Sequence, residues 1–214
     1  NDVYLATGTS IKVDSTLMGS GTIARITPNY IDENTVLTGT FVSSEYTKFS
    51  VTQPAFATNL WTIKSDGTLK AIPTIISGGS GAWKRLKDAV ENLPEGSAIT
   101  IDGEINATNY FGDDDRGVID ITKNLTIQGK TGANSDMLNA NRVSLSTNAH
   151  PIFRVSGGRT LTLKNLTLKG GKGISGTFGG AINVTGGLSK AELTDCIIED
   201  CEADNGGAIG CGSG

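Results

Sequence analysis

The sequence predicts an all-β protein built as a β-solenoid, a parallel β-helix whose turns stack into a column, with one capping α-helix at about residues 82–93. Two repeated phrases carry this prediction. Gly179-Gly-Ala-Ile182 returns as Gly206-Gly-Ala-Ile209, and Asn124-Leu-Thr-Ile-Gln-Gly129 returns, after a longer interval, as Asn165-Leu-Thr-Leu-Lys-Gly170. One turn of such a solenoid takes about twenty to thirty residues, so we interpret the shorter interval as one turn and the longer one as two.

Composition agrees with this fold and excludes several classes of function. Of the 214 residues 29 are Gly and only 5 are Pro, which is typical of tight turns between short strands and not of collagen. The net charge is −4, and the densest basic run is Lys84-Arg85 with Lys87. We therefore expect no nucleic-acid partner. No apolar run approaches the roughly 20 residues that span a bilayer, so we expect no membrane insertion by this segment.

Residues 1–76 read as a series of short strands with period-two alternation and turn residues between them. The expected strands are 10–13, 22–26, 35–37, 48–51 and 61–63. We interpret 1–76 as the closing turns of a preceding solenoid section. The alternative is a small separate β domain, such as a β-sandwich. The composition of Ser77-Gly-Gly-Ser-Gly81 predicts a flexible linker over 77–81.

The segment 82–93 carries the one helical pattern of the chain. Its apolar residues fall on a single helix face, and Pro94 and Gly96 end it. An open end of a strand column exposes unpaired edges and bare core, so a helix placed here acts as a cap. We therefore predict that residues 82–214 hold this cap and the first turns of a parallel β-helix. Because the chain opens on Asn1 and stops just after a repeat, we expect a fragment truncated at its C-terminus.

Strand patterns repeat from Ala98 onward. The expected strands are 99–101, 118–121, 125–127, 143–145, 152–155, 161–163, 166–168, 181–184, 191–193 and 197–198. Asn165 and Asp195 each join two of these strands, and Asn and Asp tolerate the left-handed conformation that such corners require. We predict that eight apolar side chains point into the column: Leu125, Ile127, Leu161, Leu163, Leu166, Leu168, Leu193 and Ile198.

These residues resemble a known family. A capping helix, then Ile99-Thr-Ile-Asp-Gly103, then Leu161-Thr-Leu-Lys-Asn-Leu-Thr-Leu-Lys-Gly-Gly171, is similar to the pectate-lyase-like right-handed β-helix. The Gly-Gly-Ala-Ile element resembles the repeats of polymorphic outer-membrane proteins and spirochaete surface proteins. The resemblance covers about residues 82–209. It implies a long protein that is secreted or displayed on the bacterial cell surface, with a part in adhesion.

Charged residues give candidate sites that spacing alone does not assemble. Asp113, Asp114 and Asp115 beside Arg116 are the densest cluster; three carboxylates suit Ca²⁺, but the alternating order of an EF-hand is missing, and a solvated loop accounts for them. Lyases and glycosidases of the resembling fold use acids and a basic residue on one exposed sheet face. The corresponding candidates are Asp120, Arg142, Arg154 and Lys164.

Nothing in the spacing places two acids and a base on one face, and His150, the only histidine, has the neighbour Pro151 of a turn position. We therefore assign no catalytic, cofactor-binding or metal-binding residue, and expect no cofactor. Cys196, Cys201 and Cys211 match no zinc spacing, and we predict free thiols that fill the interior.

The expected function is a non-catalytic adhesin-type module of a secreted or bacterial cell-surface protein, with a host protein or glycan bound on an exposed face. The alternative is a polysaccharide lyase or glycoside hydrolase of the same fold. A third interpretation is a spacer that holds another domain away from the cell. The first two differ in whether carboxylates and an arginine converge in a groove on one sheet face.

Overall fold

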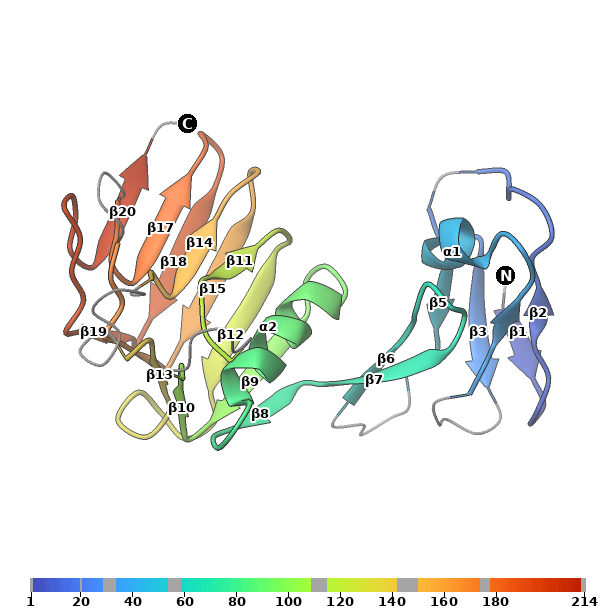
Figure 1. Cartoon of the computed structure of the whole chain (residues 1–214), viewed down its shortest axis with the longest axis horizontal. Coiled ribbons are helices and arrows are strands. Elements are labelled where there is room, and N and C mark those ends of the chain that lie inside the picture. The colour runs from blue at the N-terminus through green and yellow to red at the C-terminus, as the bar shows by residue number, and fades with distance from the viewer. Residues whose placement is uncertain are drawn as a thin grey trace. The chain divides into compact units, whose positions relative to one another are not determined.

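The computed structural model of the chain describes residues 2–19, 21–28, 34–53, 59–108, 115–141, 150–173 and 178–212. The predicted fold class is confirmed. The chain is all-β, its parallel strands stack into a β-solenoid of about six turns, and the described residues include two short α-helices (Figure 1). Contacts divide it into unit 1, Asn1–Pro73, and unit 2, Thr74–Gly214.

Unit 1 is made of short strands that pair mainly in parallel. Its elements are β1 (Asp2–Leu5), β2 (Ile11–Lys12), β3 (Ala24–Pro28), β4 (Leu37–Thr38), α1 (Val42–Glu45), a 3₁₀ turn (Tyr46–Lys48), β5 (Phe49–Val51), β6 (Asn59–Ile63) and β7 (Leu69–Pro73). One sheet has the order β1-β3-β5, β2 pairs with β4, and β6 forms an antiparallel hairpin with β7.

The spacing of these pairs favours stacked turns over a sandwich. In the parallel pairs β1–β3, β3–β5 and β2–β4, the second strand follows the first after about twenty to thirty residues, the length of one solenoid turn. Parallel neighbours at such intervals are typical of a solenoid, whereas sandwiches are built from antiparallel strands. The short helix α1 lies between the expected strands 35–37 and 48–51, where the sequence indicated no helix.

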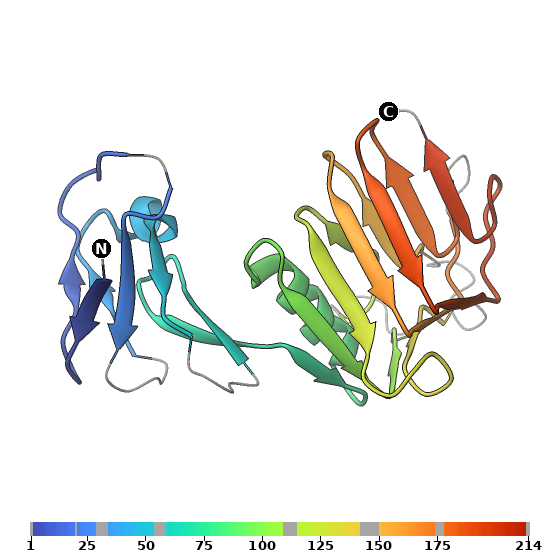
Figure 2. The same cartoon turned by 180° about the vertical axis from the view of Figure 1, so that it is seen from behind.

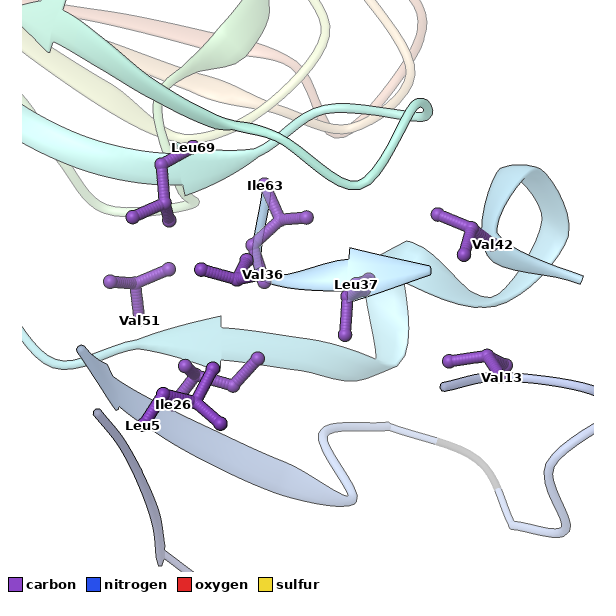
Figure 3. Packing of buried hydrophobic residues seen from close by; sticks show 9 residues of the cluster. All are labelled: Leu5, Val13, Ile26, Val36, Leu37, Val42, Val51, Ile63 and Leu69. Carbon is purple, nitrogen blue, oxygen red and sulfur yellow. The ribbon is translucent and has the colours of Figure 1, made fainter. Parts of the chain in front are cut away.

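Unit 1 has its own hydrophobic core (Figure 3). Side chains from most of its elements converge there, and Ile26, Leu37 and Leu69 are fully buried. The remaining members are Leu5, Val13, Val36, Val42, Val51 and Ile63. A shared core of this kind is what allows such short strands to hold together.

Unit 2 is a column of three parallel sheets, with α2 (Ala82–Asn92) at one end and the last strands of the chain at the other (Figures 1 and 2). The first sheet is β8 (Ile75–Ser77), β9 (Ala98–Asp102), β12 (Leu125–Gly129), β15 (Thr160–Lys164) and β18 (Lys190–Thr194). The second is β10 (Glu104–Asn106), β13 (Met137–Asn139), β16 (Thr167–Lys169) and β19 (Ile197–Glu199). The third is β11 (Ile119–Ile121), β14 (Phe153–Val155), β17 (Ile182–Thr185) and β20 (Ile209–Gly212).

One of the two repeat intervals was interpreted correctly. Ile182 pairs with Ile209, so the two Gly-Gly-Ala-Ile elements are one turn apart, as predicted. The longer interval, between the two Asn-Leu-Thr phrases, is not two turns. Leu125 pairs with Leu161 one turn on, whereas Leu166 precedes β16 in a different sheet. Turn length varies because loops of different size leave the column between the same strands.

The interior follows the predicted alternation. Six of the eight predicted inward side chains are at most 2% exposed, and the other two, Leu193 and Ile198, are half-buried because they belong to the last turn. Asn165 and Asp195 both have φ of 51°, which confirms the left-handed corners. The predicted strand at 143–145 lies outside the described residues.

The predicted capping helix is confirmed, and side chains from the next turn hold both of its ends. Its first residue follows Gly81, which supplies no capping side chain. Instead the buried carboxylate of Asp115 accepts hydrogen bonds from the N–H groups of Gly81 and Lys84, at 2.9 and 2.8 Å. At the other end Lys123 Nζ donates to the carbonyls of Glu91 and Leu93. An acid at the N-terminus and a cation at the C-terminus both complement the helix dipole.

The chain divides after Pro73 and not at the predicted linker. The segment 77–81 lies inside unit 2, where β8 pairs with β9 and Arg85 donates to the carbonyls of Ser77 and Ser80. Gly78 approaches so closely that a Cβ there would lie 2.3 Å from the Glu104 carbonyl oxygen. Glycine at position 78 therefore allows close packing, although the Gly/Ser composition of 77–81 resembles that of a flexible linker.

Candidate ligand-binding groove

The structure brings together two of the four residues that the sequence proposed as candidates. Asp120 on β11 and Arg154 on β14 are register neighbours in the third sheet. Lys164 lies on β15 in the first sheet, so it belongs to another face of the column. Arg142 lies outside the described residues.

Asp120 and Arg154 form a two-pronged ion pair. Arg154 Nε and a terminal nitrogen donate to the two carboxylate oxygens of Asp120, at 2.5 and 2.8 Å, with both side chains about half exposed. This hydrogen bonding raises the pKa of Arg154 above its ordinary value. A guanidinium held protonated in this way is suited to bind an oxygen-rich ligand and unsuited to remove a proton.

A groove of about 560 Å³ lies between α2 and β11, beside this ion pair. It is lined by Lys87, Val90 and Glu91 of the helix and by Gly117, Val118, Ile119, Asp120 and Thr122 of the strand segment. β11 is one of the two edge strands of its sheet, the one that contacts α2. Ile119 donates its N–H to the carbonyl of Ile152, the residue before β14, so the backbone groups of Asp120 point the other way, toward the groove. The groove thus offers polar backbone and charged side chains around an apolar floor.

Buried contacts fix the wall of the groove at Gly117. Trp83 Nε1 donates to the Gly117 carbonyl at 2.8 Å, and the Gly117 N–H donates to His150 Nε2 at 3.0 Å. The rings of Trp83 and His150 meet edge to face, with centroids 5.6 Å apart. Lys87 Nζ donates to the Arg116 carbonyl. His150 lies in this packed layer between α2 and the column, where both of its ring nitrogens have partners.

We expect His150 to make the stability of unit 2 depend on pH. Burial lowers its pKa below 6.5, the hydrogen bond to Pro151 opposes this, and the charges of Arg116 and Lys87 add to the lowering. Just below pH 6.5 the histidine of the unfolded chain therefore binds a proton, whereas the buried His150 of the folded chain does not. We expect the contribution of His150 to the free energy of unfolding to be fully present above this pH. Below it, the free energy of unfolding should fall by at most about 1.4 kcal/mol per pH unit.

Urea unfolding at several pH values checks this expectation. The chain has one histidine, so His150→Gln, which keeps a hydrogen-bond acceptor, should remove the slope over roughly one pH unit below 6.5. The same slope in the variant would show that another group is responsible.

Beyond the ion pair, the row across the third sheet continues to Asn183 and Gly210. The Asn183 side chain is 8% exposed, and its carbonyl oxygen has no hydrogen-bond partner in the described structure. Phe178 crosses the sheet here, because Gly210 and Gly212 leave room for its backbone and ring, and the ring remains 39% exposed. An acid, a guanidinium and a partly exposed aromatic ring therefore gather on one face, and the amide of Asn183 lies buried in the same row.

The acidic cluster has a structural role where it can be described. Asp113 and Asp114 lie outside the described residues. Asp115 is buried and caps α2, so it does not belong to a solvated loop. Within the described ranges, no group of three or more potential metal ligands is found. Cys196, Cys201 and Cys211 are free thiols. The first two are half-buried, whereas Cys211 is exposed, so the prediction that all three fill the interior is wrong for Cys211.

Sequence reasoning missed Glu91, Asn183 and Phe178. The alternation along residues 181–184 indicates that Asn183 points away from the column, and this signal could have identified it as a candidate. The sequence could not show that Asn183 neighbours Arg154 across the sheet, because the turn from Asp120 to Arg154 is longer than the turn from Arg154 to Asn183. Without a constant turn length the sequence could not align the row.

The fold and this groove define a parallel β-solenoid with a capped end and a candidate binding face. No known protein family, curated protein or solved structure matches the chain. In the part of the chain that the structure describes, no helix is both long and apolar enough to span a bilayer.

Proposed function

We propose that unit 2 is a non-catalytic, glycan-binding module of a secreted or bacterial cell-surface protein. In this proposal it is of the adhesin type and related to the pectate-lyase-like right-handed β-helices, among them the polymorphic outer-membrane proteins. The ligand lies in the groove between α2 and β11 and along the row Asp120, Arg154 and Asn183. The observation that carries the proposal is the two-pronged Asp120–Arg154 pair, whose Asp120 lines the groove.

The chemistry of this face suits a sugar. Hydroxyl groups of a glycan both donate and accept hydrogen bonds, so they match the half-exposed carboxylate of Asp120 and guanidinium of Arg154. The exposed ring of Phe178 adds an apolar surface on which a sugar ring can pack. Contacts to α2 and His150 fix the groove before the ligand arrives, which reduces the entropic cost of binding.

The rival function is cleavage of a polysaccharide. Its support is that two carboxylates, Glu91 and Asp120, line the same groove, because glycoside hydrolases use a pair of acids. Against it, Asp120 is engaged by Arg154, and the raised pKa of Arg154 makes this arginine a poor base for a lyase.

Binding to a panel of immobilised neutral and uronate-containing oligosaccharides tests the proposal. Arg154→Ala should weaken binding at least tenfold, because a hydrogen bond to a charged group is worth about 1.5–3 kcal/mol and about 1.4 kcal/mol is a factor of ten. Lys164→Ala is the matched control, an exposed cation of the first sheet, and should bind as the parent chain does.

Two results would contradict the proposal. One is that no glycan of the panel binds, or that Lys164→Ala and not Arg154→Ala abolishes binding. The other is product formation from the same polysaccharides, with or without added Ca²⁺, that is lost in Glu91→Gln or Arg154→Ala. That second result would establish the enzyme in place of the binding module.

A further inference from the structure

A titratable side chain lies directly behind the wall of the groove. His150 is only 7% exposed, and its ring meets the N–H of Gly117 through Nε2 and the Pro151 carbonyl oxygen through Nδ1, at 3.0 and 2.9 Å. A backbone N–H only donates and a carbonyl only accepts, so Nε2 carries a lone pair and Nδ1 carries the proton. The closed wall therefore requires the neutral form of this ring.

Three contacts hold the groove wall at Gly117, and one of them depends on a proton. Trp83 and Lys87 of α2 donate to the carbonyls of Gly117 and Arg116, which accept at any pH. A protonated His150 would instead set its own N–H against the N–H of Gly117, and that hydrogen bond would be lost. Gly117 has a φ of 88°, and glycine reaches other conformations at low cost, so the wall can move when this contact breaks.

The charges around the ring add to this conflict. Lys87 on α2 and Arg116 on the wall segment both act on His150, and both are cations. Asp115, the acid of the same segment, is committed to the N-terminus of α2. On the column side the His150 carbonyl accepts the N–H of Lys172, whose ammonium group lies 3.5 Å from the carboxylate of Glu202. A proton on His150 would thus place a further cation beside two others in a buried layer, which is unfavourable.

We propose that His150 is a pH switch for the groove. When its ring takes up a proton from solvent, the contact to Gly117 breaks, the wall moves away from the column and the groove releases its ligand. The opening of the wall depends only on contacts within unit 2, whereas the release of a glycan rests on the proposed function. Because the closed groove requires the neutral ring, proton and ligand oppose each other, and each weakens the binding of the other.

An NMR titration of the whole chain tests the opening of the wall without any ligand. His150 is the only histidine, so its ring signals report its midpoint directly. The signals of the Gly117 N–H and the Trp83 indole N–H should shift with the same midpoint, below pH 6.5. Over this range the amide of Ile127 inside the column and the indole N–H of Trp61 in unit 1 should stay unchanged.

Two variants connect the wall to the histidine. His150→Gln keeps a hydrogen-bond acceptor but takes up no proton, so its wall signals should not titrate. Lys87→Met removes a neighbouring cation, so the midpoint of His150 should rise, and the midpoint of the Gly117 signal should rise with it. The inference is overturned if the wall and the column change in a single transition, because acid would then unfold unit 2. It is also overturned if His150 titrates while Gly117 does not respond, or if the two midpoints separate in Lys87→Met.

Ligand binding tests the release. For an oligosaccharide of the panel that binds at neutral pH, the Kd should rise about tenfold roughly one pH unit below the midpoint of His150, and His150→Gln should remove this rise. Saturation with the same oligosaccharide should in turn lower the midpoint. A Kd that stays constant while the wall opens would overturn the release of ligand by acid. If no oligosaccharide binds, the proposed function fails, whereas the titration of the Gly117 signal still decides whether His150 opens the wall.

Discussion

Leu166→Ala should reduce the free energy of unfolding of unit 2 by about 2–5 kcal/mol, the range found for truncation of a buried leucine. Leu166 directly follows the Asn165 corner, is fully buried, and points into the column between β15 and β16. Turns above and below surround it, so the structure has little freedom to fill the cavity that alanine leaves.

Urea unfolding followed by circular dichroism measures this loss. Leu188→Ala is the matched control, because Leu188 is 79% exposed and its truncation should change stability by less than about 0.5 kcal/mol. A loss at Leu166 as small as that of the control would place the side chain outside the column and contradict the observed alternation.

Gly129→Ala should destabilise unit 2 by about 1–3 kcal/mol or more, because it adds a methyl group where two turns meet. A Cβ at this position would lie 2.0 Å from the Asn165 carbonyl oxygen and 2.9 Å from the Asp136 carboxylate. Neither can withdraw easily. Asn165 forms a corner of the next turn, and the Asp136 carboxylate accepts hydrogen bonds from the N–H groups of Gly103 and Gly132.

Gly187→Ala is the comparison for this variant. A Cβ on Gly187 would have no atom within 4 Å, so alanine should be neutral or slightly stabilising there. If Gly129→Ala were as well tolerated as Gly187→Ala, the turns would not approach each other at Asn165.

The fold could be predicted from sequence because its determinants are local. Alternation in segments such as 161–163 reports which side chains are buried, and the corner residues Asn165 and Asp195 report where the chain bends. The capping helix could be predicted for the same reason. The sequence did not predict strands β10 and β13, because Glu104–Asn106 and Met137–Asn139 each have one buried residue between two polar or partly exposed ones.

Register and site were harder because they depend on loop lengths. The repeated Asn-Leu-Thr phrase suggested that Asn124 and Asn165 are equivalent, yet the first copy forms β12 in one sheet and the second leads into β16 in another. The same uncertainty in register affects the candidate site. Asp120 and Arg154 were both proposed from their types, but only the pairing of β11 with β14 shows that they meet.

The register between turns is the central claim, since it creates the Asp120–Arg154 pair, and a short bifunctional thiol reagent tests it most directly. In a chain whose three cysteines are replaced by alanine, Gln128→Cys is combined with either Lys164→Cys or Lys169→Cys. Gln128 and Lys164 are register neighbours on adjacent strands, which lie about 4.8 Å apart. Lys169 lies on another sheet. We predict efficient crosslinking of the Gln128/Lys164 pair and none of the Gln128/Lys169 pair. Crosslinking of the second pair and not the first, as the repeated Asn-Leu-Thr phrase alone would suggest, would contradict the account.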